Sequence, residues 1–295
     1  MWGGSIGGIC EISFGAILVK IPRKLFELIF KATQAQPWLG KCSESLMELM
    51  DECGELVEQE LVLELLNRFC YLDTDRHSQC IDKIAQKIAV GWSLSESETQ
   101  IVAATADSAA DSGQLVVYEV KNAVGRFGWK TPFAVNRYDK VYKEIASRPN
   151  IVLVDEFMGS GRTMAGRVRT ILRELKGRGV SGVKIYVASY AGMVHSTIPV
   201  KAEGCQDIFL GVELKKGISE MSNPAYVDRD LATMGKVEDR LAVIVNGKSL
   251  PRLGDAGSEA LYARTNGNTP NSVFPVFWWP ELKVGKTRNT ILSRI

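Results

Sequence analysis

Two adjacent carboxylates and a turn rich in glycine and hydroxyl groups follow an apolar run in the middle of this chain. The segment Val-Asp-Glu-Phe-Met-Gly-Ser-Gly-Arg-Thr covers residues 154–163 and follows Ile-Val-Leu at 151–153. Such an apolar, β-branched run is typical of a strand buried on both faces, and residues 164–175 have the pattern of an amphipathic helix. The carboxylates and the turn are therefore predicted to lie at a strand–loop–helix junction.

The turn has the chemistry of a phosphate-binding loop. The first amide groups of a helix have no partners inside the helix and carry a partial positive charge, so an anion binds there readily. The candidate phosphate ligands are Gly159, Ser160, Gly161, Arg162 and Thr163. When ionised, Asp155 and Glu156 only accept hydrogen bonds, which suits sugar hydroxyls or a divalent cation and would repel phosphate. This layout favours a ribose 5-phosphate unit, with its phosphate in the turn and its hydroxyls on the acids.

Two common nucleotide motifs do not fit the turn. A nucleoside triphosphatase loop needs Gly-x-x-x-x-Gly-Lys, which the chain does not contain, and a dinucleotide fingerprint needs Gly-x-Gly-x-x-Gly. The glycines here stand at 159, 161 and 166, so the second spacing is five residues. An ordinary strand–turn–helix of an α/β protein is the remaining alternative.

The whole run, with four apolar residues, Asp-Glu, three residues and Ser-Gly-Arg-Thr, resembles the 5-phosphoribosyl-1-pyrophosphate (PRPP) motif of type I phosphoribosyltransferases. The resemblance implies that Asp155 and Glu156 are the catalytic-site acids that hold the ribose hydroxyls, and that residues 159–163 hold the 5-phosphate. It also implies Mg²⁺ as a cofactor that enters with PRPP, with indirect contact to the same two acids. Purine-type members place an Asp where this chain has Gly159, so a purine salvage role is not implied.

A second resemblance lies in residues 268–279, Asn-Thr-Pro-Asn-Ser-Val-Phe-Pro-Val-Phe-Trp-Trp, together with Gly254-Asp255 upstream. The run is similar to a divergent phosphoribosyltransferase branch of bacterial conflict and anti-phage loci, some of them beside retron reverse transcriptases. That similarity implies a toxin-like effector that acts on a nucleotide or nucleic acid, with a reverse transcriptase and its msDNA as partner. A non-catalytic PRPP or nucleotide sensor on the same fold is the alternative. The aromatic residues either pack in the core or form a stacking wall for a base.

Two further segments are candidates for the pyrophosphate. In the resembled family a loop after an early strand holds this group, and the matching residues are Thr105, Ala106, Asp107 and Ser108. This loop lacks Lys and Arg, and Asp107 and Ser108 have the equal alternative of capping the next helix. Arg126 and Lys130 lie in a glycine-rich segment that could close over the pyrophosphate as a flexible loop, or form a surface turn.

Alternating strand and helix patterns from residue 100 onward predict an α/β fold: a parallel-sheet, type I phosphoribosyltransferase-like core with helices on both faces. Residues 1–92 read as a mostly helical N-terminal lobe, and residues 93–295 as the α/β domain with a hood-like C-terminal segment. The acids and the turn then lie at the carboxyl edge of the sheet, where ligands bind in such folds.

Composition is consistent with a cytoplasmic protein. The 36 basic and 34 acidic residues give a net charge of +2, so no strong field attracts nucleic acid. The apolar segment 6–19 contains Glu11 and is shorter than the roughly 20 residues that span a bilayer, so we expect no membrane association. Phosphoribosyltransferases are often dimeric, which makes a homodimer the expectation from the resemblance.

Overall fold

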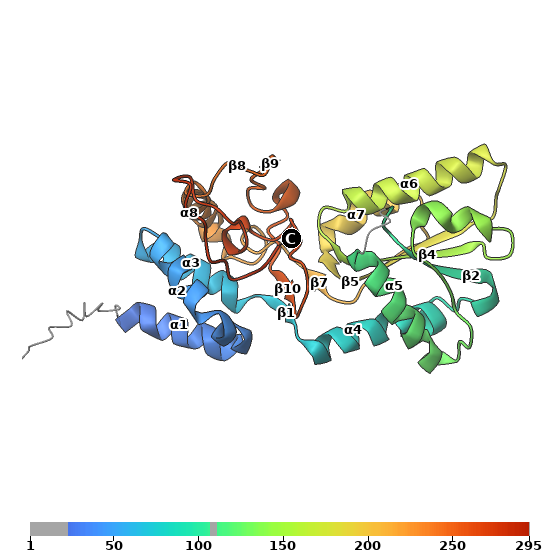
Figure 1. Cartoon of the computed structure of the whole chain (residues 1–295), viewed down its shortest axis with the longest axis horizontal. Coiled ribbons are helices and arrows are strands. Elements are labelled where there is room, and N and C mark those ends of the chain that lie inside the picture. The colour runs from blue at the N-terminus through green and yellow to red at the C-terminus, as the bar shows by residue number, and fades with distance from the viewer. Residues whose placement is uncertain (1–22, 107–110, 295) are drawn as a thin grey trace, which may run out of the picture.

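A sheet of six parallel strands forms the centre of one half of the molecule (Figure 1). The computed structural model describes residues 23–106 and 111–294. Along the sheet the strands follow the order β3-β2-β4-β5-β6, and β7 continues the pairing along β5. The strands are β2 (Thr99–Ala103), β3 (Phe133–Val135), β4 (Asn150–Met158), β5 (Lys184–Met193), β6 (Asp207–Leu210) and β7 (Glu213–Leu214).

Helices cover both faces of this sheet. One face packs against α4 (Thr74–Gln86) and α5 (Ser112–Ala123), and the other against α6 (Arg162–Gly177) and α7 (Thr197–Ala202) (Figure 1). The alternation within β4 explains this, because Val152 and Val154 pack with α5 while Ile151 and Leu153 pack with α6. The predicted α/β fold with a parallel sheet and helices on both faces is confirmed.

The strand order reverses between β2 and β4. From β2 the chain passes through α5 to β3 on one side, and then returns to β4 on the other side of β2. In open parallel sheets this reversal leaves a crevice at the carboxyl ends of the two central strands, and ligands bind there. The segments after β2 and β4 are the two in which the sequence predicts pyrophosphate and phosphate loops.

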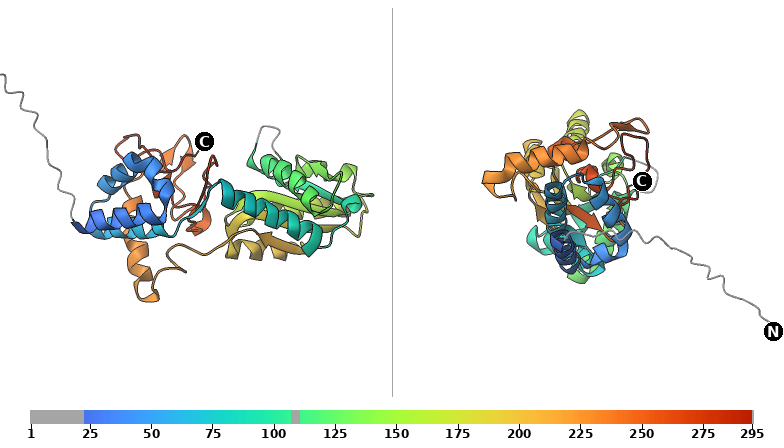
Figure 2. Two further views of the ribbon diagram at one scale, coloured as in Figure 1. Left: turned by 90° about the horizontal axis from the view of Figure 1, so that it is seen from below. Right: turned by 90° about the vertical axis from the view of Figure 1, so that its left-hand side faces the viewer.

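The other half of the molecule is built from the N-terminal helices and the C-terminal segment of the described residues (Figure 2). It contains α1 (Arg23–Ala35), the 3-10 helix η1 (Pro37–Cys42), α2 (Ser43–Glu52), α3 (Leu56–Asn67) and α8 (Val227–Glu238). Strand β1 (Cys70–Leu72) pairs in parallel with β10 (Tyr262–Arg264), and β8 (Ile244–Val245) forms a hairpin with β9 (Lys248–Ser249). The C-terminal segment therefore packs against the N-terminal helices as well as covering the sheet edge.

The predicted division between residues 92 and 93 stays a prediction. Helix α4 lies before that boundary but packs against α5 and β5 of the sheet half. The apolar segment 6–19 lies outside the described residues. Within the described residues, no helix is both long and apolar enough to cross a bilayer.

The aromatic run near the C-terminus packs in the core. Phe274 and Phe277 are fully buried, and the indole N–H groups of Trp278 and Trp279 donate to backbone carbonyls at 2.9 Å in both cases. A buried indole needs such a partner for its N–H group, and both tryptophans have one inside the protein. Of the two alternatives for this run, core packing is correct.

Candidate functional site

Strand β4 runs through both acids of the motif instead of ending before them. Asp155 pairs in register with Ser189 of β5, and pairing continues to Met158. Successive side chains of a strand point to opposite sides, so the two acids have different surroundings. Asp155 borders two cavities at the end of the strand, whereas the carboxylate of Glu156 forms a buried ion pair.

The turn after β4 needs glycine at two positions. Gly161 precedes α6 with φ +75°, and a Cβ there would lie 2.1 Å from the carbonyl oxygen of Ser196. A Cβ on Gly159 would lie 1.7 Å from Oγ of Ser272. The Asp of purine-type relatives could not stand at 159 unless the segment containing Ser272 moved, which gives a physical reason for this departure.

A cavity of about 150 Å³ lies over the turn. Its walls come from the end of β4, the turn, the start of α6 and the C-terminal segment. The lining residues are Asp155, Phe157, Met158, Gly159, Ser160, Gly161, Thr163, Met164, Asp255, Pro270, Asn271 and Ser272. The two sequence segments that carry the family resemblance therefore meet at one cavity, and residues 270–272 form part of its cover.

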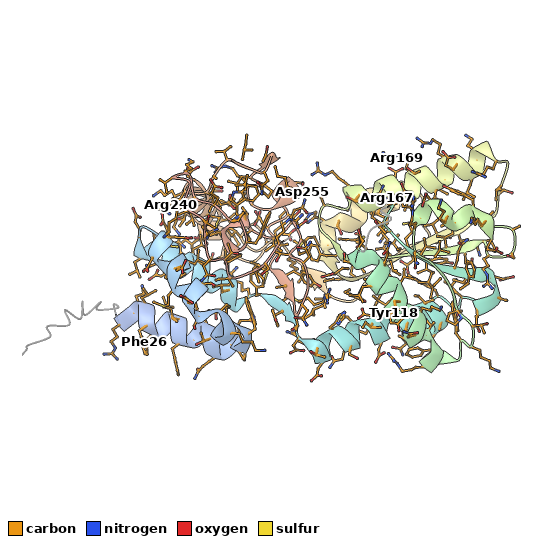
Figure 3. All side chains as sticks on the ribbon, viewed as in Figure 1. Phe26, Tyr118, Arg167, Arg169, Arg240 and Asp255 are labelled. Carbon is orange, nitrogen blue, oxygen red and sulfur yellow. The ribbon has the colours of Figure 1, made fainter. Side chains whose placement is uncertain are left out.

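A carboxylate from the C-terminal segment contacts the turn. Asp255 lies on the side of that segment that faces α6 (Figure 3), and Ser160 Oγ donates to it at 3.2 Å. The guanidinium of Arg162 donates to both of its oxygens, at 3.0 and 3.1 Å. Two of the predicted phosphate ligands thus have the carboxylate of Asp255 as their partner in this structure.

The surroundings of the Asp155 carboxyl group disfavour its ionised form. Burial raises its pKa to about 7, and the nearby carboxylates of Asp111 and Glu156 act in the same direction. The amide N–H of Glu156, which donates to Asp155 Oδ1 at 2.7 Å, opposes the shift. An acid with its pKa near neutrality, placed in a cavity wall, is typical of a functional site.

Glu156 connects the sheet to the C-terminal segment. Its two oxygens accept from Nε and Nη2 of Arg264 at 3.1 and 2.9 Å, and the two side chains are only 6% and 8% exposed. Arg264 ends β10, so this pair joins β4 to the cover of the site. Both oxygens of Glu156 therefore have partners within the chain, whereas Asp155 lines two cavities.

The loop after β2 lies beside Asp155. The amide of Ala104 donates to the carbonyl of Val154 at 3.0 Å, and Thr105 is buried with its carbonyl accepting from Tyr138 at 3.0 Å. Ala106 is half-buried, and Asp107 and Ser108 lie outside the described residues. The N-cap of α5 is Asp111, whose side chain accepts from Gly113 at 2.6 Å. Thr105 and Ala106 thus lie in the loop beside the end of β4, and their role in holding pyrophosphate stays a prediction.

The predicted flexible loop lies at the opposite edge of the sheet. Arg126 forms an ion pair with Asp82 of α4, and the amide of Lys130 donates to Glu96, which precedes β2, at 3.0 Å. Both residues come before β3, at the amino ends of the strands, whereas Asp155 lies at the carboxyl ends. A role for Arg126 and Lys130 in closing over pyrophosphate does not fit this placement.

Two other arginines supply positive charge at the carboxyl ends of the strands, on the same side of the sheet as Asp155. Arg167 of α6 donates to the carbonyl of Ala104 at 3.3 Å and to the hydroxyl of Tyr138 at 3.1 Å (Figure 3). Arg137 follows β3 and pairs with Asp139 at 2.8 Å. Sequence reasoning missed both. A signal existed for Arg167, because it stands four residues after Thr163 in a predicted helix and so shares its face.

The fold and this site define an α/β protein with a glycine turn at the crevice of a parallel sheet, under a C-terminal cover. The model of the family PRTase-CE, a phosphoribosyltransferase-type family, matches residues 54–293, and the chain belongs to this family. The comparison with curated proteins gives no match. Among solved structures, the chain is similar to a novel cobalamin-binding protein from Desulfitobacterium hafniense DCB-2, at 9% identity over 62% of this chain and 92% of that chain. The TM-score of this comparison is 0.28.

Proposed function

We propose that this protein binds PRPP or a similar ribose 5-phosphate ligand at the crevice between β2 and β4 and transfers the phosphoribosyl group. The observation that carries the proposal is the position of Asp155, which borders both the cavity over the glycine turn and a second cavity of about 140 Å³ beside it. A sugar phosphate of the predicted kind needs an acid for its hydroxyls and a nearby turn for its phosphate, and the fact that Asp155 and the glycine turn line the same cavity supports this proposal.

In this proposal each part of the ligand has a partner. The 5-phosphate lies on the amides at the start of α6 and on Ser160 and Arg162, where it replaces the carboxylate of Asp255. The ribose hydroxyls donate to Asp155. The pyrophosphate points toward Thr105 and the positive charge of Arg167, which the carbonyl of Ala104 holds at that edge.

The residues present fit Mg²⁺ that enters with the ligand. Mg²⁺ is usually held by one or two carboxylates together with substrate phosphates and keeps several waters. Among the described residues there is no cluster of three or more His, Cys, Asp or Glu side chains suited to a metal ion, so a preformed protein cage is not indicated. The carboxyl group of Asp155 can contribute an oxygen ligand. Glu156 is less suited, because Arg264 donates hydrogen bonds to both of its oxygens. The metal would supply charge neutralisation on the pyrophosphate.

The reaction class is displacement at C1 of the ribose. The bond between C1 and the pyrophosphate oxygen breaks, pyrophosphate leaves with the bonding electrons, and a nucleophile of the acceptor bonds to C1. Residues of this chain contribute by holding the sugar in position and by stabilising charge on the leaving group. Asp155 orients the ring through its hydroxyls.

The biological setting we propose is that of a cytoplasmic, toxin-like effector of a retron-type anti-phage system that acts on a nucleotide or nucleic acid. A reverse transcriptase with its msDNA would then be its partner, and the chain could act as a homodimer. This rests on the resemblance of residues 268–279. Growth arrest on expression, abolished by Asp155→Asn, is the expected outcome for an effector.

A non-catalytic sensor is the second candidate, and one observation favours it. Ser160 and Arg162 already have an internal anionic partner in Asp255, so ligand binding would release that partner and move the cover of the site. Ligand binding without pyrophosphate release, together with normal growth on expression, would identify a sensor.

The test is calorimetric titration of the purified protein with PRPP, with and without Mg²⁺. Wild-type protein is expected to bind, and Asp155→Asn to bind about tenfold to a hundredfold more weakly, since a hydrogen bond to a charged group is worth about 1.5–3 kcal/mol. Glu238→Gln is the matched control, because this buried acid also has its pKa raised to about 7 but does not line the cavities bordered by Asp155. Equal binding by wild type and Asp155→Asn would refute the site.

A further inference from the structure

The second cavity bordered by Asp155, of about 140 Å³, is also lined by a guanidinium group. Arg294 of the C-terminal segment lies in its wall together with Asp155 and Glu156. Glu156 already forms a buried ion pair with Arg264, so its charge is neutralised within the chain. The charges that face this cavity are therefore the carboxyl group of Asp155 and the guanidinium of Arg294.

Two contacts hold the Arg294 side chain in place. Its Nη1 donates to the carbonyl of Thr269, and the guanidinium lies over the ring of Trp278, 5.1 Å from the ring centroid. Within residues 23–106 and 111–294, Arg294 forms no ion pair, and its other N–H groups have no hydrogen-bond partner. Since a guanidinium has five N–H groups, most of its donors are available to a ligand.

The surroundings of Arg294 disfavour a charge without a counter-ion. The side chain is half-buried, and burial lowers the pKa of its guanidinium. Charged groups that are removed from water are usually paired with a group of opposite charge. An anionic group bound in this cavity would supply the partner that Arg294 does not have among the described residues.

The start of helix α5 borders the same cavity. Ser112 is the first residue of α5 and one of the lining residues. The amino end of a helix carries a partial positive charge, although the side chain of Asp111 already accepts from Gly113 there. The helix therefore adds to the positive charge of Arg294 but does not replace it.

The basic residues considered so far for the pyrophosphate do not line this cavity. Arg126 and Lys130 come before β3, at the amino ends of the strands. Arg167 lines neither of the two cavities bordered by Asp155. The loop at 104–111, which follows β2, contains no Lys or Arg of its own. Positive charge for a pyrophosphate at Asp155 must therefore come from another part of the chain.

We infer that Arg294 binds the pyrophosphate of the ligand whose ribose lies at Asp155. Its free N–H groups donate to the pyrophosphate oxygens and stabilise the negative charge that grows on them as the bond to C1 breaks. This inference rests on the proposed function. It assigns to the C-terminal segment the basic side chain that the loop after β2 lacks.

The test is calorimetric titration of the full chain with PRPP and with ribose 5-phosphate, both with Mg²⁺. The two ligands differ only in the pyrophosphate, so their comparison isolates its contacts. Arg294→Met keeps a long side chain next to Trp278 but removes the charge. It is expected to weaken PRPP binding about tenfold or more, as loss of a hydrogen bond to a charged group does, and to leave ribose 5-phosphate binding unchanged.

Two further variants complete the design. Arg294→Lys retains the positive charge and is expected to recover part of the affinity for PRPP. Lys248→Met is the matched control, because Lys248 is an exposed cation that lines the neighbouring cavity at Trp278 but neither cavity bordered by Asp155. It should leave the affinity for both ligands unchanged.

The comparison of the two ligands also separates a specific effect from misfolding. If Arg294→Met binds neither ligand, Arg294→Lys decides: weaker binding of PRPP alone supports the inference, and equal weakening of both ligands overturns it. Unchanged PRPP binding in Arg294→Met, with ribose 5-phosphate bound as in the wild type, overturns this inference alone. If the wild type binds neither ligand, the proposed function fails and this inference fails with it.

Discussion

At the residue scale, the most informative group is the carboxyl of Asp155. Its pKa rises from 3.8 to about 7, so the folded state holds this proton more tightly than the unfolded state does. The resulting stabilisation is complete below pH 3.8 and is lost as the pH rises through 7. At neutral pH the carboxyl group of Asp155 is therefore close to the midpoint of its titration. It can release its proton and then accept a hydrogen bond from a ligand hydroxyl.

The prediction from this linkage concerns Asp155→Asn. Its midpoint of thermal unfolding should exceed that of the wild type above pH 7, and the difference should shrink steadily as the pH falls toward 4. Thermal scans by circular dichroism at pH 4.5, 6 and 8.5 measure this. A difference that does not depend on pH would show that the carboxyl does not titrate near neutrality.

The contact of Asp255 with the turn gives a second prediction. If a phosphate must displace this carboxylate, Asp255→Asn should bind inorganic phosphate up to about fivefold more tightly, because a half-exposed ion pair is worth at most about 1 kcal/mol. Asp239→Asn, which removes the exposed pair with Arg252, is the control and should leave the affinity unchanged. Phosphate titrations at constant ionic strength decide this, and weaker binding by Asp255→Asn would contradict the displacement.

The acids and the glycine turn could be predicted at this scale because they are contiguous in sequence and their chemistry is local. Asp255 could not, since it lies 93 residues from Arg162 and nothing in its own neighbourhood indicates an anion site. The separation of roles between Asp155 and Glu156 was also missed. The sequence places the strand end before the acids, whereas the pairing of β4 with β5 continues past both.

At the element scale, one ion pair connects the sheet to the cover of the site. Glu156 and Arg264 are both more than nine-tenths buried, and removing one partner leaves an uncompensated buried charge. Glu156→Gln is expected to destabilise the protein by about 3–5 kcal/mol, and Glu156→Gln with Arg264→Met by clearly less. Urea unfolding of both single variants and the double variant measures this. Additive losses would mean that the pair is not coupled.

Secondary structure in the sheet half follows from the pattern of apolar residues. The run at 151–154 predicts β4, and the periodicity of 164–175 predicts α6, which spans Arg162–Gly177. For the segment containing Arg126 and Lys130, the sequence leaves open a loop that closes over pyrophosphate or a surface turn, and the position before β3 favours the surface turn. Its glycines and basic residues resemble a mobile anion loop, but an approach to β3 from the end of α5 must lie at the amino edge of a parallel sheet.

At the scale of the whole molecule, the N-terminal helices and the C-terminal segment form one structure. Arg288 donates to Glu52 of α2 at 2.6–3.0 Å and to the carbonyls of Val276 and Trp279 at 2.9 and 2.7 Å. Glu52 and Arg288 are 236 positions apart in the sequence, so no local pattern could predict their contact. The N-terminal helices thus help to hold the cover over the site.

The prediction at this scale is that Arg288→Met lowers stability by about 3–5 kcal/mol, because a nearly buried carboxylate loses its partner. It should also weaken PRPP binding at temperatures where the protein is still folded, since residues 268–272 are held through the same segment. Arg169→Met, which removes an exposed pair with Glu203, is the control and should change neither property. Loss of stability without any effect on binding would show that the N-terminal helices do not support the site.

The central claim is that the carboxyl edge of β2 and β4 binds a ribose 5-phosphate unit through separate phosphate and hydroxyl contacts. The most direct measurement follows the phosphorus NMR signal of ribose 5-phosphate during titration with wild-type protein and with Asp155→Asn at pH 8, with inorganic phosphate as the second ligand. We predict saturable binding of both ligands to the wild type, mutual competition, and at least tenfold weaker binding of the sugar phosphate alone in Asp155→Asn. Equal affinity of ribose 5-phosphate for the two proteins, or no binding to the wild type, would contradict the assignment.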